Sequence, residues 1–191
     1  EVFTLRSSQH QDFTGSSGSS YSSLLRVWVK AAMIACITII AKENNPILLR
    51  VFANTSDESK FQYISYCAVD LLEEKERNLP APTPEMKQEE RDRVLGLRRS
   101  GMFLGLLYPV EDYKVFGYVM STGVRLVLIV DENDRQDESM VVAMFKKIQA
   151  LYTDCASNPF YKAGQPLTYP KLDRDLKDLV RLWNDGRFAA K

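Results

Sequence analysis

Few residues in this sequence have a type and a spacing suited to catalysis or metal binding. There is one histidine, His10, and it lies in a polar N-terminal segment. Ser-His-Asp and Cys-His nucleophile systems and His-rich metal sites all require an imidazole, so catalysis is a minority hypothesis. The cysteines Cys36, Cys67 and Cys155 lie 31 and 88 positions apart, which excludes a local zinc or dithiol motif. We interpret all three as reduced, buried, small hydrophobic residues.

Two short segments have the composition of ligand-binding loops but lack required residues. The acidic run at 131–138 suggests a calcium loop, whose pattern needs Asp or Asn at its fifth position and Glu at its twelfth. Arg135 and Val142 stand there instead, so we interpret the run as a solvated turn before a helix. Gly96 and Gly101 have the spacing of a phosphate loop, but no Lys follows the second glycine. The sequence therefore predicts no metal ion and no cofactor.

The overall composition is that of an ordinary globular domain without a dominant charge. The chain has 191 residues, of which 45% are hydrophobic and 26% charged, and its 25 Lys and Arg residues balance 25 Asp and Glu residues. Proteins that bind nucleic acids or anionic membranes normally carry a basic excess on one face. The neutral balance therefore argues against both of these functions.

Hydrophobic periodicity predicts two strands and a helix in the first half of the chain. The apolar run 31–41 is too short to cross a membrane, and its β-branched residues favour a buried strand. A turn cluster separates it from a second apolar segment at 47–52, so the two segments form a predicted hairpin. From Asp57 to Arg77, apolar residues recur at the three- and four-residue spacing of a buried helix face. That face comprises Phe61, Ile64, Ala68, Leu71 and Leu72.

The second half of the chain predicts three strands and two helices. Strands at 102–108, 113–120 and 124–130 are joined by turns so short that they must be adjacent and antiparallel. The last of them is apolar at six of seven positions, which predicts a central strand covered on both faces. Helices follow at 137–157 and from Pro170 onward. The order ββαβββαα indicates an α+β fold with a five-stranded, largely antiparallel sheet that buries helices on its faces.

The chain is expected to hold a single domain at residues 31–187. Residues 1–30 are rich in Ser and Gly and have no sustained period, so we interpret them as a flexible extension or a remnant of cloning. A Pro-rich and charged segment at 78–100 is predicted to be a surface insertion, because each Pro disfavours helix at the residue before it.

The strongest functional signal is an aromatic and acidic stripe on the predicted helix 57–77. Tyr63, Tyr66, Asp70 and Glu73 follow one another at spacings of three, four and three, opposite the core face. An ordinary solvent-exposed face carries Lys, Glu and Gln, whereas Tyr is enriched where proteins bind one another. The stripe therefore predicts a protein contact, and the alternative is a wide core face or isolated exposed tyrosines.

A second candidate contact follows the predicted helix 137–157, at Asn158, Pro159, Phe160 and Tyr161. Two hypotheses remain open for this segment. The loop folds its aromatic rings onto the sheet, or it presents them as an anchor for a partner protein.

Several stretches of the chain resemble the sedlin-like small subunits of the transport protein particle (TRAPP) tethering complex. These stretches are IACITIIAKENNPILLR (34–50), KFQYISYCAVDLLEEK (60–75), FLGLLYPVEDYKVFGYV (103–119), RLVLIVD (125–131) and MFKKIQALYTDCASNPFY (144–161). The most specific blocks are the one that contains Tyr108, Pro109 and Tyr113 and the segment Asn158 to Tyr161. We therefore add Tyr108, Pro109 and Tyr113 to the predicted contact residues.

The resemblance implies a longin-like, or SNARE-like, fold with one helix on one face of the sheet and two on the other. It further implies a non-enzymatic subunit of a cytosolic assembly on Golgi and endoplasmic-reticulum-derived membranes, which tethers vesicles and promotes nucleotide exchange on Rab GTPases. The implied partners are other TRAPP subunits and, indirectly, a Rab GTPase, with membranes reached only through the complex. In this family the acidic residue of the first helix is associated with subunit contacts, and Asp70 corresponds to it.

Two alternatives come from other functional classes. A longin domain of a SNARE or another trafficking protein predicts a following coiled coil or a lipid-anchor cysteine near the C-terminus, and neither occurs before the chain ends at Lys191. A small-molecule enzyme on an α+β scaffold predicts a polar pocket with clustered titratable groups.

Overall fold

The computed structural model describes residues 34–53, 58–78, 85, 87–89, 91, 101–133 and 137–189. Its elements follow the predicted order ββαβββαα. The predicted extension at 1–30 lies outside the described residues, as does most of the insertion at 78–100. Within the insertion, the Arg91 amide donates to the Lys87 carbonyl oxygen at 3.0 Å, which is the bond of one helical turn. The division of the chain into an extension and one domain stays a prediction.

Five strands form one antiparallel sheet in the order β2-β1-β5-β4-β3. They are β1 (Ile34–Ile40), β2 (Pro46–Val51), β3 (Met102–Val110), β4 (Tyr113–Val119) and β5 (Arg125–Asp131). The predicted central strand is confirmed, because β5 lies between β1 and β4. Along β5, Leu126, Leu128 and Val130 belong to the core on one face, whereas Val127 and Ile129 belong to the core on the other.

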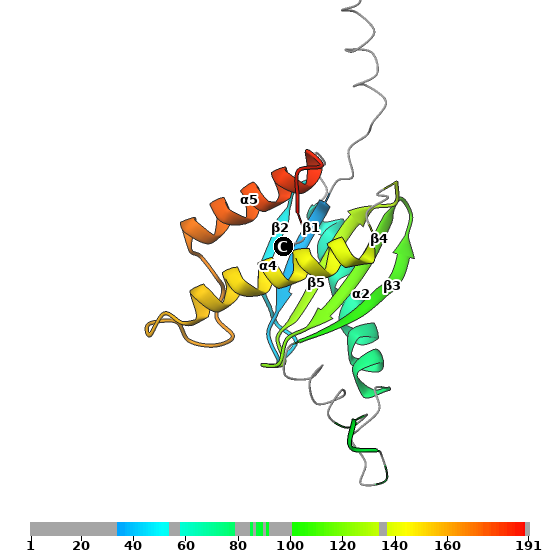
Figure 1. Cartoon of the computed structure of the whole chain (residues 1–191). Coiled ribbons are helices and arrows are strands. Elements are labelled where there is room, and N and C mark those ends of the chain that lie inside the picture. The colour runs from blue at the N-terminus through cyan, green and yellow to red at the C-terminus, as the bar shows by residue number, and fades with distance from the viewer. Residues whose placement is uncertain are drawn as a thin grey trace, which may run out of the picture. The chain divides into compact units, whose positions relative to one another are not determined.

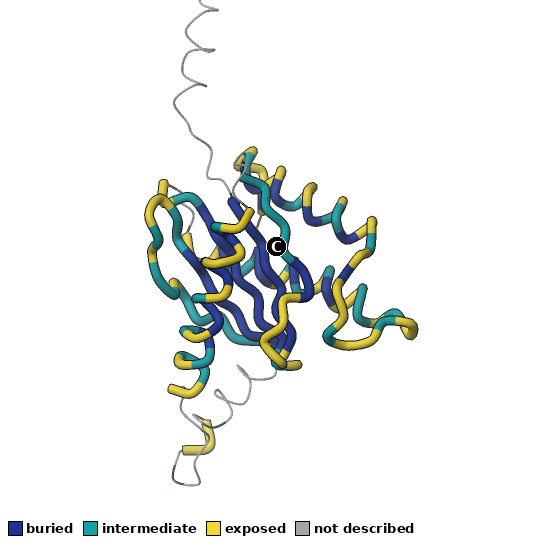
Figure 2. The backbone as a smooth tube through the Cα atoms, turned by 180° about the vertical axis from the view of Figure 1, so that it is seen from behind, coloured by how far each residue is buried: buried dark blue, intermediate teal, exposed yellow. Residues whose placement is uncertain are grey.

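One helix covers one face of the sheet and two cover the other, as the resemblance implies (Figure 1). Helix α2 (Glu58–Arg77) packs over the face that contains Val127, while α4 (Glu138–Ala156) and α5 (Pro170–Asn184) cover the opposite face. Pro170 occupies the first turn of α5, where its missing N–H costs nothing. Seen from behind, the middle strands are the buried centre, and exposed residues follow the outer side of each helix (Figure 2).

Two details differ from the sequence prediction. In α2, Val69 is buried and Leu71 is only half-buried, so the core face turns slightly further around the helix than predicted. Strand β3 continues through Pro109 to Val110, where a turn was predicted, because Val110 pairs with Tyr113 of β4. An edge strand tolerates Pro where the backbone nitrogen faces away from the sheet, because an N–H at that position would make no hydrogen bond within the sheet.

The cysteine interpretation is right for one residue and wrong for two. Cys36 is fully buried in β1, and burial raises the pKa of its thiol to about 12. Cys67 and Cys155 are only half-buried. Cys67 lies on the rim of the α2 core face and Cys155 in the last turn of α4, where the periodicity places a residue beside the core rather than within it.

Candidate protein-interaction surface

The outward side of α2 carries three of the predicted contact residues. Tyr63 is 70% exposed, Tyr66 is 59% exposed and Asp70 is also exposed. Their spacing places them on the side of the helix away from Phe61, Ile64 and the rest of the core face. We call this surface, made of Tyr63, Tyr66 and Asp70, the α2 face. The wide-core alternative is therefore excluded for these side chains.

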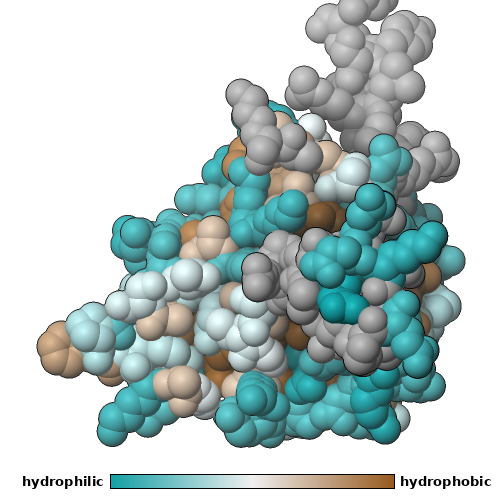
Figure 3. Space-filling model, turned by 60° about the horizontal axis from the view of Figure 1, so that its bottom comes forward, coloured by the Kyte–Doolittle hydropathy of each residue, from teal (hydrophilic) through white to brown (hydrophobic). Residues whose placement is uncertain are grey.

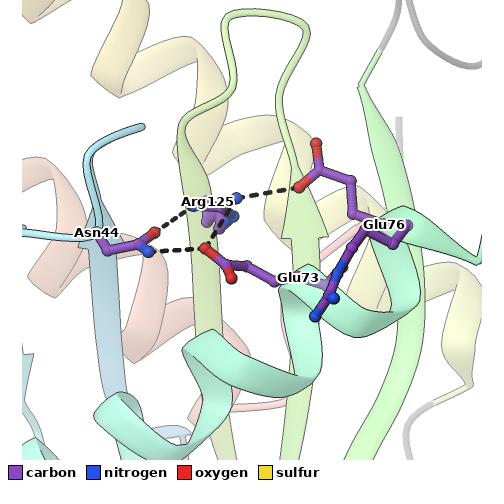
Figure 4. A network of polar contacts seen from close by, with 5 residues as sticks. Asn44, Glu73, Glu76 and Arg125 are labelled. Carbon is purple, nitrogen blue, oxygen red and sulfur yellow. Dashed lines mark hydrogen bonds and ion pairs between the residues drawn. The ribbon is translucent and has the colours of Figure 1, made fainter.

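The fourth member of the stripe, Glu73, is engaged within the protein. Its carboxylate accepts a hydrogen bond from Asn44 Nδ2 at 2.7 Å and lies 3.8 Å from Arg125 Nη2. Arg125 also bonds Glu76 Oε2 at 3.2 Å and the Asn44 side-chain oxygen. The guanidinium thus joins the C-terminal part of α2 to the β1–β2 turn and to β5 (Figure 4). Glu73 extends the acidic character of the α2 face but also anchors the helix.

Tyr108 and Tyr113 lie beneath the edge of α2 rather than free on the surface. The Tyr108 hydroxyl donates to the Ile64 carbonyl oxygen at 2.7 Å, and burial raises the pKa of Tyr108 to about 12. The Tyr113 ring packs edge-on against Phe61 with 5.5 Å between centroids, and Lys60 Nζ lies 5.3 Å from the Tyr113 ring centre. Both tyrosines therefore fix α2 on the sheet, and of these three predicted contact residues only Pro109 is exposed.

Each of the two hypotheses left open by the sequence holds for one aromatic residue of the segment after α4. The Asn158 side-chain oxygen accepts from the Phe160 amide at 3.0 Å, and the Asn158 carbonyl accepts from the Tyr161 amide at 2.9 Å, which closes a tight turn. Tyr161 packs edge-on against Tyr169 and donates to the Gln165 carbonyl oxygen at 3.1 Å. Phe160, by contrast, is 90% exposed. One ring is folded onto the protein and the next is presented to solvent.

The predicted contact residues lie on two separate surfaces. Tyr63, Tyr66 and Asp70 are on the α2 side of the sheet, whereas Phe160 is at the end of the layer formed by α4 and α5. Pro109 lies on the edge strand β3 between Tyr108 and Val110, which pack on the α2-side core, so strand alternation turns it to the opposite face. The loop that carries Phe160 protrudes away from the sheet (Figure 1), and its tip is hydrophobic where it protrudes in the view from below (Figure 3). The sequence could not separate these surfaces, because their distance depends on how the layers pack.

A pocket that contains several titratable groups lies at the C-terminal end of α2. It has a volume of about 590 Å³, and Glu73, Glu76, Arg77 and Arg125 contribute its titratable groups. The two carboxylates and the Arg125 guanidinium bind one another, so they act as a structural network. Among the residues that the structure describes, no three His, Cys, Asp or Glu side chains lie close enough to share a metal ion.

Sequence reasoning missed the role of Arg125 and a buried pair of hydroxyls. Arg125 is 9% exposed, and Thr38 bonds Ser65 at 2.8 Å between β1 and α2. The available signal was a single charged residue in an otherwise apolar predicted strand, because such a residue is rarely buried without a partner.

None of the described helices is long and apolar enough to span a bilayer.

Comparison with known proteins agrees with the resemblance noted in the sequence. The Sedlin family model matches residues 39–182. Trafficking protein particle complex subunit 2-like protein of Dictyostelium discoideum is 34% identical over 151 residues, which is 77% of this chain and 96% of that protein. The Rattus norvegicus protein of the same name is 36% identical over 133 residues, 69% of this chain and 86% of its own length.

A more distant relative is trafficking protein particle complex subunit 20 of Saccharomyces cerevisiae, which is 20% identical over 166 residues, 75% of this chain and 94% of its own length. The family match begins near the end of β1 and runs into α5, so it includes strands β2 to β5, helices α2 and α4, and most of α5. On this basis the chain belongs to the sedlin family.

Proposed function

We propose that this protein is a non-catalytic subunit of the TRAPP vesicle-tethering and Rab guanine-nucleotide-exchange complex, in transport from the endoplasmic reticulum to the Golgi and at the Golgi. It acts through contacts with other TRAPP subunits, and its influence on a Rab GTPase is indirect. It is cytoplasmic and peripheral to Golgi and endoplasmic reticulum membranes, which it reaches through the complex. The names of its relatives as trafficking protein particle complex subunits support this proposal.

The observation that carries the proposal is the exposure of the α2 face. Two tyrosines more than half exposed beside a free carboxylate are an unusual solvent surface for a helix whose opposite side is fully buried. Tyr buries a large ring at a low cost in side-chain entropy when it binds a partner. Among the described residues no cation pairs with Asp70, so its charge is available to a partner.

The test is co-purification of TRAPP subunits with the tagged full chain from cells. Tyr63→Ala combined with Asp70→Ala removes one ring and one charge from the α2 face. Both side chains are exposed, so we expect the melting temperature to change by less than about 2 °C. Recovery of at least one TRAPP subunit should fall about tenfold, which corresponds to roughly 1.4 kcal/mol.

Leu182→Ala combined with Asp178→Ala is the matched control. It removes one exposed apolar side chain and one carboxylate from α5, on the opposite layer of the molecule. This variant should recover the same subunits as the unmodified chain. If the unmodified chain itself recovers no TRAPP subunit, the proposed function is wrong. If the α2 variant loses its fold, the tyrosine and the aspartate serve stability rather than contact.

A further inference from the structure

A groove with a volume of about 300 Å³ runs beside the α2 face, between α2 and the edge strand β2. Tyr66 and Val69 form its α2 wall, and Leu49 and Ile40 come from the strands. The hydroxyls of Thr38 and Ser65 line it as well, and these two groups satisfy each other by a hydrogen bond. The far rim is made by the loop before α5, at Pro166, Leu167 and Thr168.

The backbone of β2 along this groove has unused hydrogen-bonding groups. The Phe52 amide donates to the Ala35 carbonyl oxygen, so these two residues form a hydrogen-bonded pair between β2 and β1. Bonded and non-bonded pairs alternate along an antiparallel ladder, which makes Cys36–Val51 and Thr38–Leu49 non-bonded pairs. The backbone amides and carbonyls of Leu49 and Val51 therefore point outward, away from β1. The outward carbonyl of Ile47 accepts from the Leu167 amide at 2.9 Å.

Arg50 Nη1 donates to the outward carbonyl of Leu49 at 2.9 Å. Among the described residues nothing bonds the outward amides of Leu49 and Val51. A short stretch of strand edge is therefore open to an added strand.

The two edges of the sheet differ in this respect. On β3, Lys75 Nζ donates to the carbonyl oxygens of Leu104 and Leu106 at 3.0 and 2.6 Å. That strand also contains Pro109 and two irregularities in its register with β4. Bulges, proline and a covering lysine are the features that prevent an edge strand from pairing with another chain. On the β2 edge, Arg50 covers the Leu49 carbonyl oxygen in a similar way. The outward amides of Leu49 and Val51, however, have no bonding partner among the residues that the structure describes.

The charges beside the groove are acidic. Asp70 is exposed on α2, and Glu73 follows it by three residues. Two basic residues of the helix are engaged elsewhere, because Lys75 is bound to the β3 carbonyls and Lys60 to Glu111. Arg50, at the β2 rim, is held by Asp173 of α5 through bonds of 2.7 and 3.3 Å. A segment bound here would therefore gain from an Arg or Lys side chain opposite Asp70.

We infer that the β2 edge receives an extended segment of another TRAPP subunit, which pairs with the Leu49 and Val51 amides, places an apolar side chain in the groove and sets a basic side chain opposite Asp70. This is recognition by strand addition, in which main-chain bonds give affinity and the groove gives specificity. The inference rests on the proposed function, since it names how one of the partner subunits binds.

The first test is hydrogen exchange of single amides in the free chain and in the purified complex. In the free chain the Leu49 and Val51 amides should exchange fast, whereas those of Leu48 and Arg50 are protected by β1. In the complex, exchange at Leu49 and Val51 should slow about tenfold or more. Unchanged exchange at these two amides in an intact complex overturns the inference and leaves the proposed function standing.

The second test blocks the groove without touching the core. Gln62 is exposed on the groove wall, and Glu74 is exposed on the same helix outside the groove. Gln62→Trp should lower the recovery of one TRAPP subunit about tenfold, whereas Glu74→Trp should not. Equal recovery with both variants counts against the groove. Protection of Leu49 and Val51 in the free chain, together with a doubled mass in solution, would identify the occupant as a second copy of this chain and overturn the inference.

Discussion

At the scale of single residues, Tyr108 shows that a residue predicted to bind a partner can also hold the fold together. Its hydroxyl bonds the Ile64 carbonyl oxygen in α2, and its pKa of about 12 lies above the ordinary value of 10. The folded state therefore keeps the phenolic proton more strongly than the unfolded chain does. As the pH rises from 10 to 12, the unfolded chain loses this proton first and the folded state loses stability.

Tyr108→Phe should consequently reduce the alkaline loss of stability. At pH 7 the variant should lose about 1 kcal/mol with its hydrogen bond. Between pH 10 and pH 12 its free energy of unfolding should fall less steeply than that of the unmodified chain. Urea denaturation at a series of pH values measures both effects. The thiol of Cys36 titrates in the same range in both proteins, so it cancels in the comparison. Parallel pH profiles would contradict this assignment.

The residues that the sequence could place are those whose environment depends on one helix. Tyr63, Tyr66 and Asp70 lie outward because helical spacing alone puts them opposite Phe61 and Ile64. Glu73 follows the same spacing, but its partners Asn44 and Arg125 come from distant parts of the chain. Periodicity contains no information on such pairs, so the structural role of Glu73 could not be predicted.

At the scale of elements, helix α2 packs closely on the sheet at Gly117 of β4. A Cβ atom at this position would lie 2.5 Å from Leu72 Cδ2 and 3.0 Å from both methyl groups of Leu107. Gly117→Ala should therefore destabilise the protein by about 1–3 kcal/mol through overpacking, as measured by urea denaturation.

Leu72→Ala provides the control for this close approach. It should cost about 2–5 kcal/mol alone. In the Gly117→Ala background its cost should be smaller, because the shortened side chain removes the closest contact. Strict additivity of the two changes would mean that α2 moves away from the sheet instead.

The anchoring of the C-terminal part of α2 should be weakened more by the loss of Arg125 than by the loss of its partner Glu76. Arg125 has a side chain only 10% exposed, whereas Glu73 and Glu76 are 36% and 39% exposed. Arg125→Ala removes bonds to three partners, and the freed carboxylates regain some water, so the loss should be about 2 kcal/mol. Glu76→Gln breaks one half-exposed pair and should cost less than about 1 kcal/mol. Thermal or urea denaturation distinguishes these values, and a larger loss for Glu76→Gln would contradict the network.

Element order could be predicted because each helix and strand here follows its own period. The end of β3 was misplaced because it depends on pairing with another strand and not on a local pattern. Pro109, Glu111 and Asp112 form a strong local turn signal, but pairing of Val110 with Tyr113 extends the strand and leaves only Glu111 and Asp112 in the turn. Local propensity gives way where strand pairing offers more contacts.

At the scale of the whole molecule, the layered fold places two candidate contact surfaces on opposite sides of one sheet. The α2 face lies over one side, and Phe160 lies at the end of the other layer. A single flat partner surface cannot cover both, because the sheet and its helices stand between them. A subunit with this arrangement is suited to bridge two neighbours in an assembly. Neither surface needs to change shape to do so, because helix packing fixes one and a hydrogen-bonded turn fixes the other.

This arrangement predicts that the two surfaces bind different neighbours. Tyr63→Ala with Tyr66→Ala should remove one set of TRAPP subunits from the purified complex, and Phe160→Ala should remove another. Because Phe160 is 90% exposed, its loss should leave the melting temperature within about 1–2 °C. The triple variant should lose both sets independently, since distant sites contribute additively. Quantitative mass spectrometry of the purified complexes measures each loss. If both variants lose the same subunits to the same extent, one partner wraps around the molecule and the bridging arrangement is wrong.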